Sequence, residues 1–138
     1  MVTAIVGVAI LFLVLALVVA VARDPGPTPA DVAAAYEEAW DRLDFDALWD
    51  LAGDELRDGL SRRDFVAAKQ AAYARQRDLG NLAREIVIEQ VDARGTIAEV
   101  WTRVDLRDGG TAHNLLTLTK RGGRWVVVGY QLRSDAPR

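Results

Sequence analysis

The chain has 138 residues, with 17 Lys or Arg, 20 Asp or Glu and no Cys. The absence of cysteine excludes disulfide bonds, thiol catalysis and zinc–thiolate sites. The formal net charge of −3 at pH 7 argues against nucleic-acid binding, which normally requires a basic surface.

Residues 1–22 form an apolar segment without a charged side chain. A helix of this length reaches about 33 Å, and the hydrocarbon core of a bilayer is roughly 30 Å thick. We therefore predict a transmembrane anchor at 1–22 and a single-pass protein of the cell membrane. A cleaved signal peptide is the alternative, since Ala20-Val21-Ala22 has the form of a cleavage site. Against a signal peptide, no Lys or Arg precedes the apolar run, which is also long for such a peptide.

A proline-rich linker at 23–29 (RDPGPTP) follows the apolar segment. This composition predicts a short, stiff and extended connection. We expect one folded domain at 30–134 and a tail at 135–138.

Three helices are predicted at the start of the domain. The first begins at a capping box over residues 28–31 and has an apolar stripe at helical spacing: Val32, Tyr36, Ala39, Trp40 and Leu43. Asp44 is a suitable cap for a second, short helix, whose apolar face comprises Phe45, Leu48, Trp49 and Ala52. A third helix is expected from a second capping box over residues 61–64 through Leu79, because Gly80 is a typical end signal.

After residue 81 the apolar period changes from helical to alternating, which predicts four strands at 82–91, 96–106, 111–120 and 124–132. Their short glycine-containing connections favour an antiparallel meander. Helices followed by such a meander indicate an α+β fold. Alternation places one set of side chains toward the helices: Ala98, Val100, Thr102, Val104, Leu106, Asn114, Leu116 and Leu118. The last strand is apolar on both sides at 125–128, as expected of a central strand or a contact surface.

Five acidic residues gather around the second helix: Asp44, Asp46, Asp50, Asp54 and Glu55. A metal site would normally take ligands that converge from several loops. A row of carboxylates on one helix face instead suits an N-terminal cap and a solvent-exposed surface. We therefore expect no metal ion and no cofactor.

Three features resemble one family: the phrase YEEAWDRLDFDALWDL at Tyr36–Leu51, the meander, and GGRWVVVGYQL at Gly122–Leu132. Together they resemble the nuclear-transport-factor-2-like (NTF2-like) superfamily, and within it small bacterial domains of unknown function that are membrane-anchored or secreted. The resemblance implies a cone: a curved sheet wrapped around a helix, with a pocket at the open end. Members include isomerases, cyclases and dehydratases as well as non-catalytic binding and assembly modules, so the fold does not fix the function.

The resemblance and the alternation together give two sets of candidate residues. The candidates for a ligand pocket are Tyr36, Trp40, Tyr73, Thr102, Asn114 and Tyr130. The polar candidates on the concave face are Thr102, Asn114 and Tyr130, and no Asp–His pair falls there, so no catalytic residue is assigned. The candidates for an interface lie on the outer sheet face and are Ile97, Glu99, Trp101, Arg103 and His113, with Trp101 exposed unless something covers it.

Three functional hypotheses follow. The first is a membrane-anchored, non-enzymatic binding or assembly module that forms a homodimer or binds a protein partner through the outer sheet face. The second is a small-molecule-binding protein or an isomerase-, cyclase- or dehydratase-like enzyme with an apolar pocket. The third is a domain that contacts lipid headgroups through the third helix and its surroundings, with Arg62, Arg63, Lys69, Arg75, Arg77 and Arg84. Basic residues after the apolar segment favour an inward-facing domain, but the resemblance to anchored bacterial domains favours the extracytoplasmic side, which we expect.

Overall fold

A computed structural model describes residues 26–133 of the chain. The predicted anchor at 1–22, residues 23–25 of the linker and the tail at 135–138 lie outside the described residues. Between residues 26 and 133, none of the helices combines the length and the apolar character that crossing a membrane would require.

The three predicted helices are present, and each begins at the residue that the sequence indicates. Helix α2 (Pro29–Asp41) begins at a complete capping box, in which Thr28 and Asp31 exchange side-chain-to-backbone hydrogen bonds. Helix α3 (Phe45–Leu51) is capped by Asp44, whose Oδ1 accepts from the Ala47 N–H at 3.0 Å. Helix α4 (Arg62–Tyr73) is capped by the Ser61 hydroxyl. The short 3-10 turn η1 (Asp54–Leu56) follows α3.

The predicted extension of the third helix through Leu79 is wrong. Helix α4 ends at Tyr73, and a separate 3-10 turn, η2 (Arg77–Leu79), follows after Gln76 leaves the helical region at φ −129° and ψ 43°. Most helical stability in a protein comes from a packed apolar face. Residues 74–79 are all exposed, so no packing supports further helical turns there.

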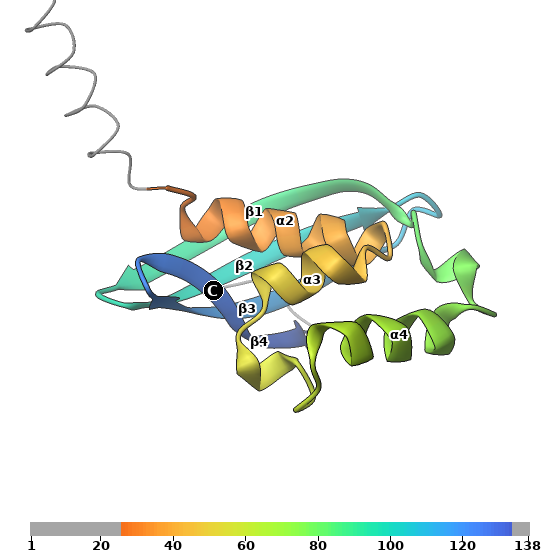
Figure 1. Cartoon of the computed structure of the whole chain (residues 1–138). Coiled ribbons are helices and arrows are strands. Elements are labelled where there is room, and N and C mark those ends of the chain that lie inside the picture. Colours follow the sequence, from red (N-terminus) through yellow and green to blue (C-terminus); the bar gives the residue numbers. More distant parts are fainter. Residues whose placement is uncertain (1–25, 134–138) are drawn as a thin grey trace, which may run out of the picture.

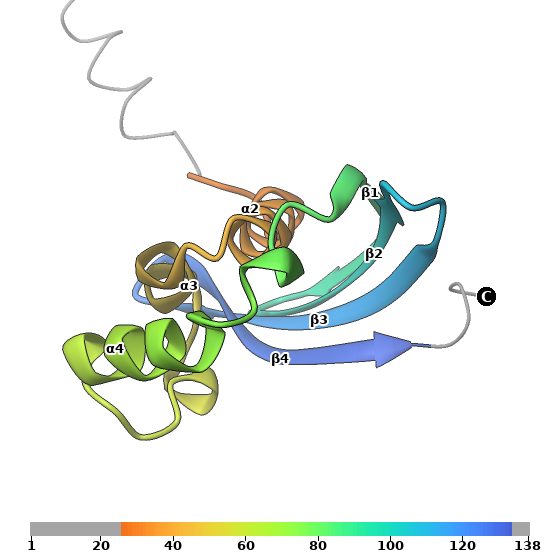
Figure 2. The ribbon, with the colours of Figure 1, turned by 90° about the vertical axis from the view of Figure 1, so that its right-hand side faces the viewer.

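Four antiparallel strands form one sheet in the order β1-β2-β3-β4: β1 (Ala83–Arg94), β2 (Ile97–Leu106), β3 (Thr111–Arg121) and β4 (Arg124–Arg133). The predicted α+β class and meander are therefore confirmed. Strand β1 continues three residues beyond the prediction, because residues 92–94 pair with residues 97–99 and the turn lies at Gly95, with φ +60°. The sheet is curved, and α2 lies against its concave face (Figure 2).

The core lies between this concave face and helices α2 and α3, which cover it (Figure 1). The predicted inward-facing set is correct at its centre, where Ala98, Val100, Thr102, Leu116 and Leu118 are fully buried. Strand β4 is an edge strand and not a central one. Its apolar run is buried because the chain after α3 crosses this edge, where the Gly53 N–H donates to the Val127 carbonyl at 2.7 Å.

Candidate ligand cavity

A cavity of about 470 Å³ opens at one end of the cone. It lies between the C-terminal half of α2 and the end of the sheet where β1 and β3 begin and β2 and β4 end. Apolar and aromatic side chains make most of its wall, among them Trp40, Leu43, Tyr73, Val104, Leu106 and Ala112. The main polar groups that line it are Glu37, Asp41, Asn114 and the Tyr130 hydroxyl.

Glu37, on α2, is the central polar residue of this cavity and is only 5% exposed. Its Oε1 accepts hydrogen bonds from the Thr102 hydroxyl at 2.5 Å and the Asn114 amide at 2.9 Å. Its Oε2 accepts from the Tyr130 hydroxyl at 2.7 Å. One donor comes from each of the strands β2, β3 and β4, so the network joins the helix to three strands of the sheet.

The Tyr130 hydroxyl is fixed as a donor to Glu37. Burial raises the pKa of Tyr130 far above its usual value, and the adjacent Glu37 carboxylate raises it further. The same oxygen accepts from the Asn114 amide at 3.1 Å, and the ring packs edge-on against Tyr36 with centroids 5.3 Å apart. Burial also raises the pKa of Tyr36. Both phenols are therefore protonated at neutral pH.

Asp41 is the second carboxylate of the cavity and shapes its entrance. Its Oδ1 accepts from the backbone N–H groups of Leu82 and Ala83, at 2.7 and 2.8 Å, and thereby holds the start of β1 against the end of α2. Exposed leucines flank the entrance: Leu79 is 45%, Leu82 42% and Leu132 76% exposed. The cavity therefore has an apolar rim and wall, and acidic groups inside.

The structure places the six residues predicted for a pocket around this network. Trp40, Tyr73, Asn114 and Tyr130 line the cavity. Tyr36 and Thr102 are 4% and 0% exposed and lie behind that lining, against Tyr130 and Glu37 respectively. The aromatic residues serve the core as well, since the Trp40 and Tyr73 ring centroids are 6.1 Å apart and both pack near Phe45.

The sequence-based candidates for the pocket do not include Glu37, which lies on α2. The polar candidates on the concave face came from strand alternation, which considers only the sheet. A signal for Glu37 was present in the first helix, where it stands four residues after Ala33 and three before Trp40, and so shares their face. A charged residue within an apolar helical stripe was the available indication.

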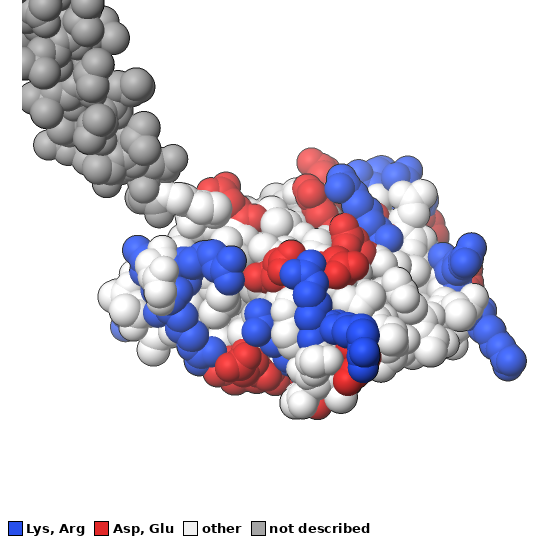
Figure 3. Space-filling model, viewed as in Figure 1, with Lys and Arg blue, Asp and Glu red and all other residues white. Residues whose placement is uncertain are grey.

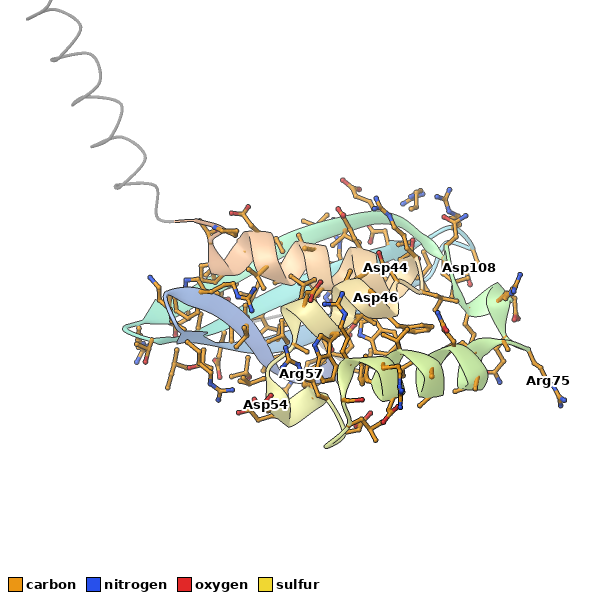
Figure 4. All side chains as sticks on the ribbon, viewed as in Figure 1. Asp44, Asp46, Asp54, Arg57, Arg75 and Asp108 are labelled. Atoms are coloured by element: carbon orange, nitrogen blue, oxygen red, sulfur yellow. The ribbon has the colours of Figure 1, made fainter. Side chains whose placement is uncertain are left out.

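The five acidic residues around α3 do not line the cavity, and four of them pair with arginines. Asp44 caps α3, as predicted. Asp46 and Asp50 both pair with Arg62, at 3.1 and 2.7 Å. Asp54 pairs with Arg57 at 3.1 Å, and both are labelled in Figure 4. Glu55 pairs with Arg121. Over residues 26–133, no group of acidic or histidine side chains has an arrangement that would hold a metal ion.

Three of the six basic residues considered for lipid contact form ion pairs with acidic side chains. Arg62 binds Asp46 and Asp50, Arg63 binds Asp64 at 3.2 Å, and Lys69 pairs with Asp58 at 3.5 Å. The helical side of the domain therefore shows interspersed basic and acidic side chains (Figure 3).

The five residues predicted for an interface lie on the outer sheet face, at 97–103 of β2 and at His113 of β3. Ile97 is 57% exposed, and Glu99 is also exposed. Trp101 is only half-buried, and the guanidinium of Arg133 lies 5.4 Å from its ring centroid, so the chain itself covers part of this ring. Arg103 and His113 both contact Glu89, at 3.4 and 3.2 Å.

Comparison with known proteins identifies the fold. A protein of Shewanella oneidensis described as NTF2-like and of unknown function is 25% identical, with a TM-score of 0.55 over 75% of this chain and 93% of that one. A Campylobacter jejuni protein named as an NTF2-like transpeptidase is 18% identical, with a TM-score of 0.52 over 73% of this chain and 97% of the other. The chain has the fold of the NTF2-like superfamily.

A third solved structure, a SEC-C-motif-containing protein from Rhodopseudomonas palustris, matches with a TM-score of 0.54 at 18% identity over 75% of this chain and 77% of that one. No family model matches the sequence, and no curated protein matches it. The NTF2-like resemblance expected from the sequence is thus confirmed for the fold. Function has to be argued from the residues of this chain.

Proposed function

We propose that this NTF2-like domain binds a small, largely apolar molecule in the cavity between α2 and the sheet. The observation that carries the proposal is a buried carboxylate, Glu37, at an open apolar cavity of about 470 Å³. Ligand sites in proteins are typically concave and mostly apolar, with a few polar groups that fix the orientation of the ligand, and have volumes of roughly 300–1,000 Å³. This cavity has each of those properties.

A cavity-filling substitution tests the proposal. Ala112 lines the cavity from β3, and an Ala112→Trp side chain would occupy part of its volume. We expect the full-length chain in detergent to bind a neutral apolar fluorophore, N-phenyl-1-naphthylamine, and Ala112→Trp to bind it about tenfold more weakly or worse. Ala93→Trp is the matched control, because Ala93 is exposed on β1 and does not line the cavity. Equal binding by both variants, or none by the wild type above the micelle blank, would contradict the proposal.

The segment at 1–22 is proposed to anchor this domain to the cell membrane, with the domain on the extracytoplasmic side. Support comes from the length and uncharged composition of the segment and from the short proline-rich linker that follows it. External protease added to intact cells should then digest the domain. Digestion only after lysis would place the domain inside.

A second candidate function is assembly through the outer sheet face, as a homodimer or with a protein partner. It is favoured by the 57% exposure of Ile97 on the same sheet face as the half-buried pair Trp101 and Leu115. Trp101→Glu should then lower the hydrodynamic mass of the full-length chain in detergent. A wild-type chain that is already monomeric would rule out the homodimer.

A further inference from the structure

The charges around the cavity indicate which class of ligand it accepts. We propose that the bound molecule carries a protonated amine and that the Glu37 carboxylate is its counter-ion. This inference rests on the proposed function, because it names the head group of the ligand in the same cavity.

Glu37 lacks a cationic partner among residues 26–133. It is 5% exposed, and its three hydrogen-bond donors are two hydroxyls and one amide, all neutral. None of the ion pairs formed within residues 26–133 includes it. A carboxylate removed from water without a neighbouring positive charge is costly, and neutral hydrogen bonds offset only part of that cost. A ligand cation would supply the missing charge.

The acceptor position that remains on the Glu37 carboxylate also favours a ligand that donates a hydrogen bond. A carboxylate offers about four acceptor positions. Three are occupied in Glu37, two on Oε1 and one on Oε2, so Oε2 retains one. The neighbouring donors are already used, because the Tyr130 hydroxyl donates to Glu37 and the Asn114 amide donates to both Glu37 and Tyr130. A ketone or ester head group would therefore find no free donor in this network, whereas an ammonium or a hydroxyl would find an acceptor. The Trp40 indole N–H has no hydrogen-bond partner among the described residues, but its nitrogen is buried.

The rest of the lining favours the ammonium over the hydroxyl. Asp41 adds a second carboxylate, and the lining, as far as it is formed by residues 26–133, includes no Lys, Arg or His. Lys69 contacts the Trp40 ring, at 5.8 Å from the centroid, but it pairs with Asp58 and does not line the cavity. The rings of Trp40 and Tyr73 add aromatic faces, which attract organic cations. An anionic ligand would meet two negative charges and no positive one.

Three probes with the same ring system and different head groups test this inference. They are 2-naphthylmethylamine, 2-naphthalenemethanol and 2-naphthoic acid, which are cationic, neutral and anionic at pH 7. Their affinities for the full-length chain in detergent would be measured by displacement of N-phenyl-1-naphthylamine, with micelle-only titrations subtracted. We expect the amine to bind about tenfold or more tightly than the alcohol, and the acid to bind most weakly.

A second test replaces Glu37, the proposed counter-ion. Glu37→Gln keeps the size of the side chain and removes its charge, so the preference for the amine over the alcohol should fall to about one. Glu38→Gln is the matched control: it makes the same change at the next residue of α2, where the side chain is 54% exposed and pairs with Arg42, and the preference should persist.

The possible results are distinguishable. If the alcohol binds as tightly as the amine in the wild type, the proposed function stands and the amine inference is overturned. If the acid binds best, the inference is likewise overturned. If no probe displaces the fluorophore and the fluorophore itself does not bind, the proposed function fails and this inference fails with it. The wild-type series alone decides these cases, even where Glu37→Gln does not fold.

Discussion

A shielded glutamate lies on each side of the sheet, Glu89 on the outer face of β1 and Glu37 on α2 against the concave face, and the two have different partners. On the outer face, the Glu89 side chain is 17% exposed and lies near two basic side chains, with Arg103 at 3.4 Å and His113 at 3.2 Å. On the concave side, Glu37 is more deeply buried, and its hydrogen-bond donors among residues 26–133 are all neutral. The outer face therefore contains partners for its own charge. On the concave side, Glu37 has no cationic partner in the part of the chain that the structure describes, and it lies beside an open cavity.

This difference indicates which surface is prepared for a small ligand. A charge network that is already paired gains little from an additional ion, because each group has a partner and solvent screens the remainder. A buried carboxylate without a cation gains more from one, because water is excluded around it. The concave end of the cone is accordingly the better candidate for a small-molecule site, and the outer face is the better candidate for a protein contact.

The largest expected effect compares two adjacent leucines of β3 that point to opposite faces. Leu116 is fully buried on the concave side, and Leu115 is half-buried on the outer side. We expect Leu116→Ala to lower the free energy of unfolding by about 2–5 kcal/mol, because it leaves a void in the core. Leu115→Ala should lower it by about 1 kcal/mol, because it removes less buried area. Urea denaturation followed by tryptophan fluorescence measures both.

The same pair of variants tests whether the outer face is covered in solution. If Leu115→Ala instead lowered the free energy of unfolding as much as Leu116→Ala does, by an amount that depends on protein concentration, that result would contradict the contrast between the two faces. It would mean that a second molecule buries the outer face and stabilises the domain by association.

The assignment of residues to the two faces could be predicted because it follows from local rules. Side chains alternate along a strand, so the positions of Val100 and Leu116 follow once the pattern of the strand is recognised. The caps at Thr28, Asp44 and Ser61 were likewise predictable, since each satisfies backbone N–H groups within three residues of itself.

The features that could not be predicted depend on contacts far apart in the chain. Glu37 becomes a site residue because Thr102, Asn114 and Tyr130 converge on it from 65, 77 and 93 residues away. The end of α4 at Tyr73 depends on where the core stops and not on the glycine that suggested a later end. Trp101 is partly covered by Arg133, which comes from β4 at the edge of the sheet, 32 positions later in the chain.

A second prediction concerns pH and the phenol at the cavity. The ordinary pKa of Tyr130 is 10.0, and folding raises it through burial and the Glu37 carboxylate. Above pH 10 the unfolded chain releases this proton while the folded chain keeps it, so stability falls as pH rises. The contribution of one such group approaches about 1.4 kcal/mol per pH unit.

Tyr130→Phe should therefore flatten the decline in unfolding free energy between about pH 10 and 12 by roughly that slope. Tyr36→Phe should act in the same direction, because burial raises the pKa of Tyr36 too. Urea titrations at several alkaline pH values, each referred to pH 7 for the same variant, measure the slopes. Identical slopes in the wild type and Tyr130→Phe would show that this phenol is not protected in the folded state.

The smallest expected effect is on the outer face. Glu89→Gln removes the charge that Arg103 and His113 contact, but Arg103 keeps Asp105 as a partner at 3.1 Å and is itself 36% exposed. We expect Glu89→Gln to lower the free energy of unfolding by no more than about 1 kcal/mol. The decrease should be smaller at high salt, because half-exposed ion pairs are weak and are screened by salt. A loss above about 2 kcal/mol that salt did not reduce would instead be typical of a charge buried without its partner. In that case the outer face would be dry in solution, and the distinction between Glu89 and Glu37 would depend on their partners alone and not on exposure to water.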